Sequence, residues 1–210
     1  MQSSKAFHFE DCHFWGNSAG GETEPGLLAS AAEGGAVAMW GGSTMFTFVN
    51  CDFVSNQATD SGGAFVAFSG VATFSDCFFE LSTAWYYDGG AVRSDINIPF
   101  RECTFMHSSC GYNKEMWGGS GGAVHGFGSH LRSTFVSNWA GMYFGGAMYG
   151  DGSCVDCIFV SNTASDGGAV GGSSMSFWGT TFFANTAVQR GPFSAREYEY
   201  AVVFGPCFVD

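Results

Sequence analysis

Apolar and polar residues alternate over short stretches of this chain, and Gly, Asn, Asp or Ser interrupts each stretch. The runs GGAFVAF, VATFSD and CFFE between residues 62 and 80 show the pattern. Alternation with a period of two is typical of β-strands with one buried face, and no run has the spacing of an amphipathic helix. The pattern therefore predicts an all-β fold built from short strands.

The pattern recurs along the chain as a repeat. Each copy resembles C-x-F-x-x-N-x-A followed by G-G-A, as in FVSN at residues 53–56 with GGAF at residues 62–65. Successive copies are separated by 23 residues, between Cys157 and Thr180, to 39 residues, between Cys12 and Cys51. A repeat of this length with three short strands predicts one coil of a parallel β-helix.

We expect residues 1–210 to form a single domain, a single-stranded right-handed parallel β-helix of about seven coils with three short strands each. The right hand follows from the general handedness of connections between parallel strands. Solenoids usually end in polar caps, and neither end of the sequence carries one. The repeat therefore predicts a fragment of a longer solenoid.

Two columns of the repeat are candidates for the core. Residues two apart on a strand share a face, so the Cys and Phe of C-x-F are expected to point inward together. The Cys column contains Cys12, Cys51, Cys77, Cys103, Ser133, Cys157, Thr180 and Cys207. The column three residues earlier contains Phe9, Phe48, Phe74, Phe100, His130, Cys154, Phe177 and Phe204.

The asparagine of the repeat predicts a structural ladder. Asn tolerates the left-handed backbone conformation of a corner, and its amide can hydrogen-bond to the Asn of the next coil. The expected ladder consists of Asn17, Asn56, Asn138, Asn162 and Asn185. At the next corner, the Gly-Gly of G-G-A is expected to avoid a Cβ clash.

The joint recurrence of GGAV, GGAF or GGAM with FVSN or FFAN resembles the repeats of chlamydial polymorphic membrane proteins, which alternate GGA-[ILV] with F-x-x-N. The resemblance covers essentially the whole chain. It implies a right-handed parallel β-helix in a secreted or cell-surface protein, commonly an adhesin-like passenger. The chain departs from that family because it shows neither a signal peptide nor a C-terminal membrane barrel. Similar repeats also resemble those of pectin-lyase-like proteins.

The net charge of the chain limits the classes of partner that we expect. The chain has 7 basic and 19 acidic residues, for a net charge of -12. Such a charge repels phosphate backbones and anionic lipids, so we expect no nucleic acid partner. The long uncharged run between Glu33 and Asp52 alternates like strands, so we expect no membrane insertion in this chain.

Six of the eight cysteines occupy the Cys column, which predicts small core residues with free thiols. Disulfides between Cys51 and Cys77, or between Cys77 and Cys103, are the alternative, because stacked coils about 4.8 Å apart lie within the Cα range of a disulfide. The single C-x-x-C, Cys154 to Cys157, falls on core columns, so we expect no metal site there.

Insertions between the Ala of the repeat and G-G-A concentrate aromatic residues at one corner. Loops on one edge of a solenoid are common binding sites, and Tyr and Trp combine apolar faces with polar tips. The candidate binding residues are Trp85, Tyr86, Tyr87, Tyr112, Trp117 and Tyr143. We therefore expect a non-enzymatic module that binds a carbohydrate or a protein surface; rings that merely cover the coil edge are the alternative.

The competing hypothesis, that the protein is an enzyme, rests on acidic residues that directly precede the Cys column. Asp76, Glu102 and Asp156 stack in this row, with Arg132 between the last two. Stacked carboxylates can serve a polysaccharide lyase or hydrolase, or chelate Ca²⁺; apart from this Ca²⁺ alternative we expect no cofactor. Acidic residues are equally ordinary at corners, where Arg132 suits a surface charge ladder. A second acidic row, Glu33, Asp88 and Asp166, directly precedes G-G-A.

Overall fold

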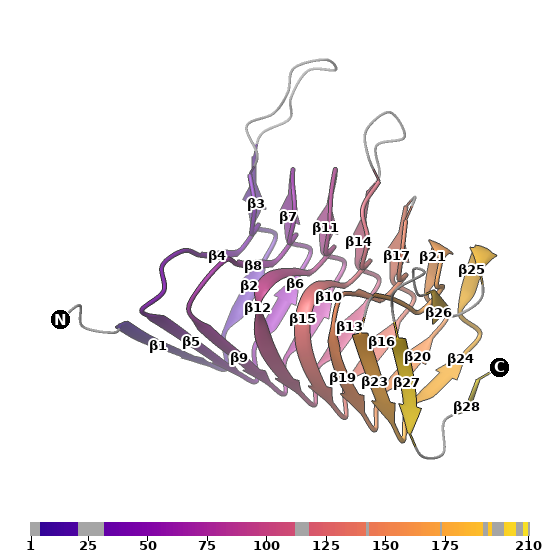
Figure 1. The fold of residues 1–210 in the computed structure, drawn as a ribbon. Helices are drawn as coiled ribbons and strands as arrows, with labels where there is room; N and C mark the ends of the chain where they lie inside the picture. The colour runs from indigo at the N-terminus through magenta and orange to yellow at the C-terminus, as the bar shows by residue number, and fades with distance from the viewer. Residues whose placement is uncertain are drawn as a thin grey trace.

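The computed structural model describes residues 5–20, 32–111, 118–141, 143–172 and 174–188, and the backbone of 189–190, 193–194, 200–204 and 208–209. The described part is all-β and forms a solenoid of about six turns with three parallel sheets (Figure 1). The predicted fold class is therefore confirmed, with about one turn fewer than the seven counted in the sequence. Within the described residues, no helix is long and apolar enough to span a membrane.

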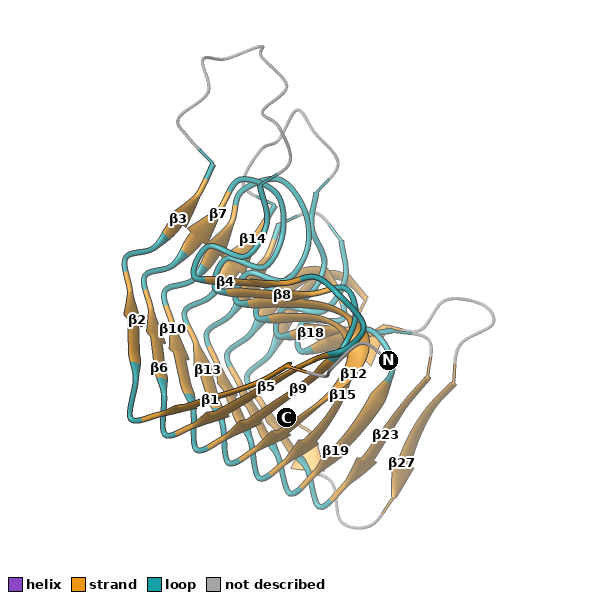
Figure 2. Ribbon diagram, turned by 90° about the vertical axis from the view of Figure 1, so that its left-hand side faces the viewer, coloured by secondary structure: helices purple, strands orange, loops and turns teal. Residues whose placement is uncertain are grey.

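Each turn contributes one strand to each of two smaller sheets (Figure 2). The eight-stranded sheet contains β2 (His13–Trp15), β6 (Asp52–Val54), β10 (Phe78–Glu80), β13 (Thr104–Met106), β16 (Thr134–Val136), β20 (Ile158–Val160), β24 (Thr181–Phe183) and β28 (Phe208–Val209). The seven-stranded sheet contains β3 (Ser18–Ala19), β7 (Gln57–Ala58), β11 (Thr83–Ala84), β14 (Ser109–Cys110), β17 (Trp139–Ala140), β21 (Thr163–Asp166) and β25 (Thr186–Arg190).

The third sheet has thirteen strands and two branches that share the long strands β12 (Val92–Arg101) and β15 (Val124–Leu131). One branch continues through β1 (Lys5–Glu10), β5 (Thr44–Val49), β9 (Val71–Ser75), β19 (Gly152–Val155), β23 (Ser174–Trp178) and β27 (Tyr200–Phe204). The other branch, here the GGA branch, continues through β4 (Val37–Met39), β8 (Phe65–Ala67), β18 (Met148–Tyr149), β22 (Val170–Gly171) and β26 (Phe193–Ser194).

The columns derived from the repeat are in register in the structure. Phe53 pairs with Phe79 across β6 and β10, and their rings stack with centroids 4.7 Å apart. Cys51 and Cys77 are buried beside them. The C-x-F residues of these coils therefore point inward, as the alternation predicts, and stacked Phe rings form the axis of the core.

The asparagine column binds neighbouring coils through its side chains. Asn138 Nδ2 donates to Asn162 Oδ1 (3.0 Å) and to the carbonyl of Phe105 (3.0 Å), while Asn138 Oδ1 accepts from Ser108 N (3.0 Å). Asn162 donates to Asn185 in the same way (2.9 Å), and Asn17 donates to Asn56 (2.8 Å).

The expected left-handed conformation of these asparagines is wrong. In the described coils, the residue directly before each ladder residue has positive φ, for example Ser137 (φ 53°) before Asn138. The corner bends at that preceding residue, so the Asn side chain can turn inward and bond two coils at once. The acidic row before the Cys column is left-handed too, including Asp76 (φ 55°).

The seven cysteines in the described part of the chain are free thiols. The alternative disulfides, Cys51 with Cys77 or Cys77 with Cys103, are therefore not formed in this structure. Burial raises the pKa of Cys51 to about 11. Burial also raises the pKa of Cys110, which packs with Ala84, Ala140 and Ala164 beside the seven-stranded sheet. A buried, protonated thiol is a poor nucleophile, so these two cysteines act as small core residues.

His130 occupies a Phe position of the core and makes stability depend on pH. Its ring stacks on Phe100 (4.7 Å), and neither ring nitrogen has a hydrogen-bond partner among the described residues. Burial lowers the pKa of His130 to about 3. The unfolded chain binds this proton below about pH 6.5, so the stabilisation by the neutral ring is complete above that pH and is lost as the pH falls towards 3.

We therefore expect the free energy of unfolding, measured by urea denaturation, to fall by about 1.4 kcal/mol per pH unit from His130 alone between about pH 6 and pH 4. His130→Phe should remove this part of the slope and, by deleting two unpaired buried nitrogens, raise stability at neutral pH by about 1 to 2 kcal/mol. His8→Phe, at an exposed side chain, is the control. An unchanged acid slope in His130→Phe would contradict the assignment.

Candidate functional site

The outer face of the GGA branch carries a column of planar side chains. Arg93 pairs in register with His125, and His125 pairs with Tyr149, across β12, β15 and β18. Each of the three lies four residues after the first Gly of a G-G-A motif. Because strand residues alternate between faces, this position points away from the buried Val92, Val124 and Met148.

Aromatic rings extend this column at both ends. The Trp40 ring stacks on Phe68 with centroids 4.1 Å apart, and the Arg93 guanidinium lies 4.8 Å from the centroid of Phe68. At the other end, His125 stacks on Tyr149 (5.2 Å), and Tyr149 stacks on Phe144 (5.7 Å). We call the set the aromatic row: Trp40, Phe68, Arg93, His125, Tyr149 and Phe144.

Carboxylates line the aromatic row. Arg93 pairs with Glu33 (3.5 Å) and with Asp95 (3.2 Å), and His125 Nε2 lies 3.6 Å from Asp88 Oδ2. Asp88 also accepts the backbone N–H of Ser120 through Oδ1 (2.8 Å). Glu33 and Asp88 of the acidic row before G-G-A therefore face the planar side chains. Asp88 also helps to fix the corner through its bond with Ser120 N.

Burial sets the charge states around the row. It raises the pKa of Glu33, with Arg93 opposing, and it raises the pKa of Asp60. Burial lowers the pKa of His125, with Asp88 opposing, so the imidazole is neutral near pH 7. In the described part of the chain, Asp60 Oδ1 and His125 Nδ1 have no hydrogen-bond partner. These two atoms are buried, whereas the side chains of Asp88 and Asp95 are 31% and 49% exposed, so the row combines aromatic faces with carboxylates that a ligand can reach.

Three of the predicted corner residues, Trp85, Tyr86 and Tyr87, form a group that is separate from the aromatic row. Backbone hydrogen bonds from Trp85, Tyr86 and Tyr87 to residues 58–60 tie this segment to the preceding coil. Trp85 is 44% exposed and Tyr87 is 42% exposed, while Trp85 Nε1 lies 3.4 Å from Gln57 Oε1. The corner is thus an ordered aromatic edge.

Among the other predicted corner residues, Tyr143 stacks with Phe144 (6.1 Å) and so adjoins the aromatic row. Tyr112 and Trp117 lie outside the described residues. No contact among the described residues brings Trp85 and Tyr143 together, since they lie on coils that flank residues 109–111.

The acidic candidates Asp76, Glu102 and Asp156 lie on an exposed corner. Arg132 Nε donates to Glu102 (3.0 Å), and this bond lowers the pKa of Glu102. Arg132 therefore separates Glu102 from Asp156, as in the surface charge ladder that the sequence suggested. The described residues contain no group of three or more His, Cys, Asp or Glu that could hold a metal ion.

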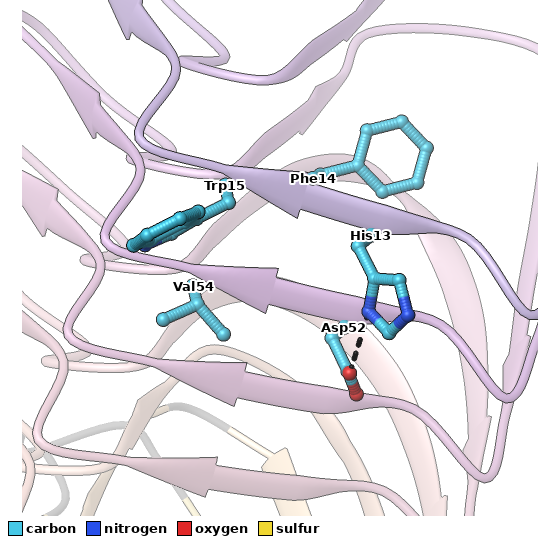
Figure 3. Close-up of a pocket in the computed structure, with 5 residues that line it drawn as sticks. All are labelled: His13, Phe14, Trp15, Asp52 and Val54. Atoms are coloured by element: carbon cyan, nitrogen blue, oxygen red, sulfur yellow. Dashed lines mark ion pairs between the residues drawn. The ribbon is translucent and has the colours of Figure 1, made fainter.

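A pocket of about 260 Å³ lies on the outside of the first two coils (Figure 3). His13 Nδ1 lies 2.8 Å from Asp52 Oδ2, and Phe14, Trp15 and Val54 complete the lining. A carboxylate in this position orients the imidazole. None of the five lining residues carries a hydroxyl or thiol group.

Comparison with known proteins finds no matching family model, no matching curated protein and no matching solved structure.

Most of the aromatic row was missed from the sequence. Its central column varies between Arg, His and Tyr, so no shared residue type marks it. The available signal is positional, because every member of that column follows G-G-A at the same distance. Trp40 and Phe68 directly follow the paired strands β4 and β8, and the stacking of the coils brings them to Arg93.

Proposed function

We propose that the chain is a non-enzymatic β-solenoid module that binds carbohydrate through the aromatic row. The proposal rests mainly on Trp40, which is 65% exposed while its ring stacks on Phe68. A flat apolar ring held from behind offers its free face to a sugar ring at little entropic cost. The adjoining carboxylates supply hydrogen-bond acceptors for hydroxyl groups.

The GGA and F-x-x-N motifs support a more specific assignment. We infer a repeat of the polymorphic membrane protein type, in a secreted or cell-surface protein with an adhesive role. A second binding edge at Trp85 and Tyr87 fits this role, because both rings are exposed at the corner where the insertions occur. A protein ligand at that edge is the alternative to a glycan.

A catalytic role for Asp76, Glu102 and Asp156 has less support. Paired catalytic carboxylates need environments that separate their protonation states inside a site that holds substrate. Here the side chains lie on an exposed corner and one of them is paired with Arg132. Release of unsaturated or reducing ends from polysaccharides by the purified chain would restore the enzymatic hypothesis.

Trp40→Ala tests the proposal. We expect it to weaken binding to oligosaccharides about tenfold, because stacking on an aromatic face contributes on the order of 1 kcal/mol or more. Trp178→Ala is a matched control, since Trp178 is 54% exposed on the other branch of the sheet. Isothermal titration against a panel of soluble glycan hexamers measures both.

The same panel distinguishes the two surfaces. A double variant, Trp85→Ala with Tyr87→Ala, should leave glycan binding unchanged if the aromatic row is the site. Equal losses in Trp40→Ala and Trp178→Ala, or no binding of any glycan by the unmodified chain, would refute the proposal. Thermal denaturation of each variant separates lost binding from lost folding.

A further inference from the structure

The charges around the aromatic row point to the class of its ligand. Glu33, Asp60, Asp88 and Asp95 surround it, while Arg93 is the cation they share and His125 is neutral. The chain as a whole carries a net charge of -12. The local and the overall field therefore both favour a cation over an anion.

Part of this negative charge is available to a ligand. Arg93 is already bonded to Glu33 and Asp95, and Asp88 faces an uncharged imidazole. The side chains of Asp95 and Asp88 are 49% and 31% exposed, so both carboxylates can be reached from outside. These acceptors lie beside aromatic faces, which also attract cations through their ring quadrupole.

The shape of the row favours a polymer. Arg93, His125 and Tyr149 belong to three successive coils, which stack about 4.8 Å apart, a spacing close to the length of one pyranose ring. A linear glycan that lies along the solenoid axis would place successive sugars over successive coils. Each amino group would then meet the row of carboxylates at the base of the GGA corner.

We propose that the aromatic row binds a linear glycan whose sugars carry free amino groups, as in a β-1,4-linked glucosamine polymer. This inference rests on the proposed carbohydrate-binding function and adds the charge of the ligand. Polyuronates and sulfated glycans are disfavoured because their carboxylates or sulfates would face Glu33, Asp88 and Asp95.

The experiment compares three hexamers with the same β-1,4 backbone: glucosamine, N-acetylglucosamine and glucose. At low ionic strength and a pH at which the amines are charged, we expect the glucosamine hexamer to bind about tenfold tighter than the other two. Salt should reduce this advantage, because exposed charge pairs are screened.

Charge variants locate the effect. Asp88→Asn combined with Asp95→Asn removes two charges and keeps an acceptor for Ser120 N, so folding should be preserved. We expect this variant to bind glucosamine hexamer about fivefold more weakly and to lose most of the salt dependence. Asp76→Asn with Asp156→Asn, on the exposed corner, makes the same change in net charge and should bind normally.

The outcomes separate this inference from the proposed function. Equal affinity for all three hexamers, or a preference for a polyuronate, overturns the amine specificity and leaves carbohydrate binding standing. No binding of any glycan overturns both. Equal losses in the two double variants place the amine site away from the aromatic row and overturn the assignment made here.

Discussion

Asn138→Ala is expected to lower the free energy of unfolding by about 3 kcal/mol, because it leaves buried groups unpaired. Asn138 is fully buried, as is Asn162 in the next coil. Removal of the Asn138 side chain takes away the hydrogen-bond partner of Ser108 N and one donor each from the carbonyl of Phe105 and from Asn162 Oδ1. Urea denaturation followed by circular dichroism measures the effect.

Asn138→Ser provides the matched comparison, since Ser82 and Ser108 hold the same column in two other coils. It should cost less than Asn138→Ala because a hydroxyl still offers one donor and one acceptor. Glycan binding should be unchanged in both variants, because the ladder is remote from the aromatic row. Lost binding at unchanged stability in Asn138→Ala would contradict the structural role of the ladder.

Gly90→Ala is expected to have a larger effect, more than about 4 kcal/mol or failure to fold. A Cβ at Gly90 would overlap the carbonyl oxygen of Gly122 in the next coil and lie 2.5 Å from Ser109 N and O. All of these are backbone atoms. They belong to strand-paired coils, so no side-chain rotation can relieve the overlap.

Gly42→Ala is the control for this substitution. A Cβ there meets no atom within 4 Å, so the variant should be as stable as the unmodified chain or slightly more stable. Yield of soluble protein, circular dichroism and thermal denaturation compare the two variants. Similar stability of Gly90→Ala and Gly42→Ala would show that the G-G-A corner is not closely packed.

Side-chain packing at a repeating position is what made the core predictable. Phe53, Phe79 and their equivalents recur because every coil must present the same shape to its neighbours. The same constraint predicted the register of the Cys column. It gave no account of the corner backbone, because residue type favours Asn138 over Ser137 for the left-handed conformation, whereas the structure places that conformation at Ser137.

The sequence by itself thus determined the all-β solenoid, the interior columns and the places where aromatic and acidic residues gather, since periodic spacing is a property of the covalent chain. The tertiary structure decided which side chains meet. Trp40 and Phe68 lie six residues after the first Gly of their G-G-A motifs and Arg93 lies four residues after its own, and stacking of the coils places the three in contact. The proposed binding surface depends on that contact, which the spacing of the motifs alone does not specify.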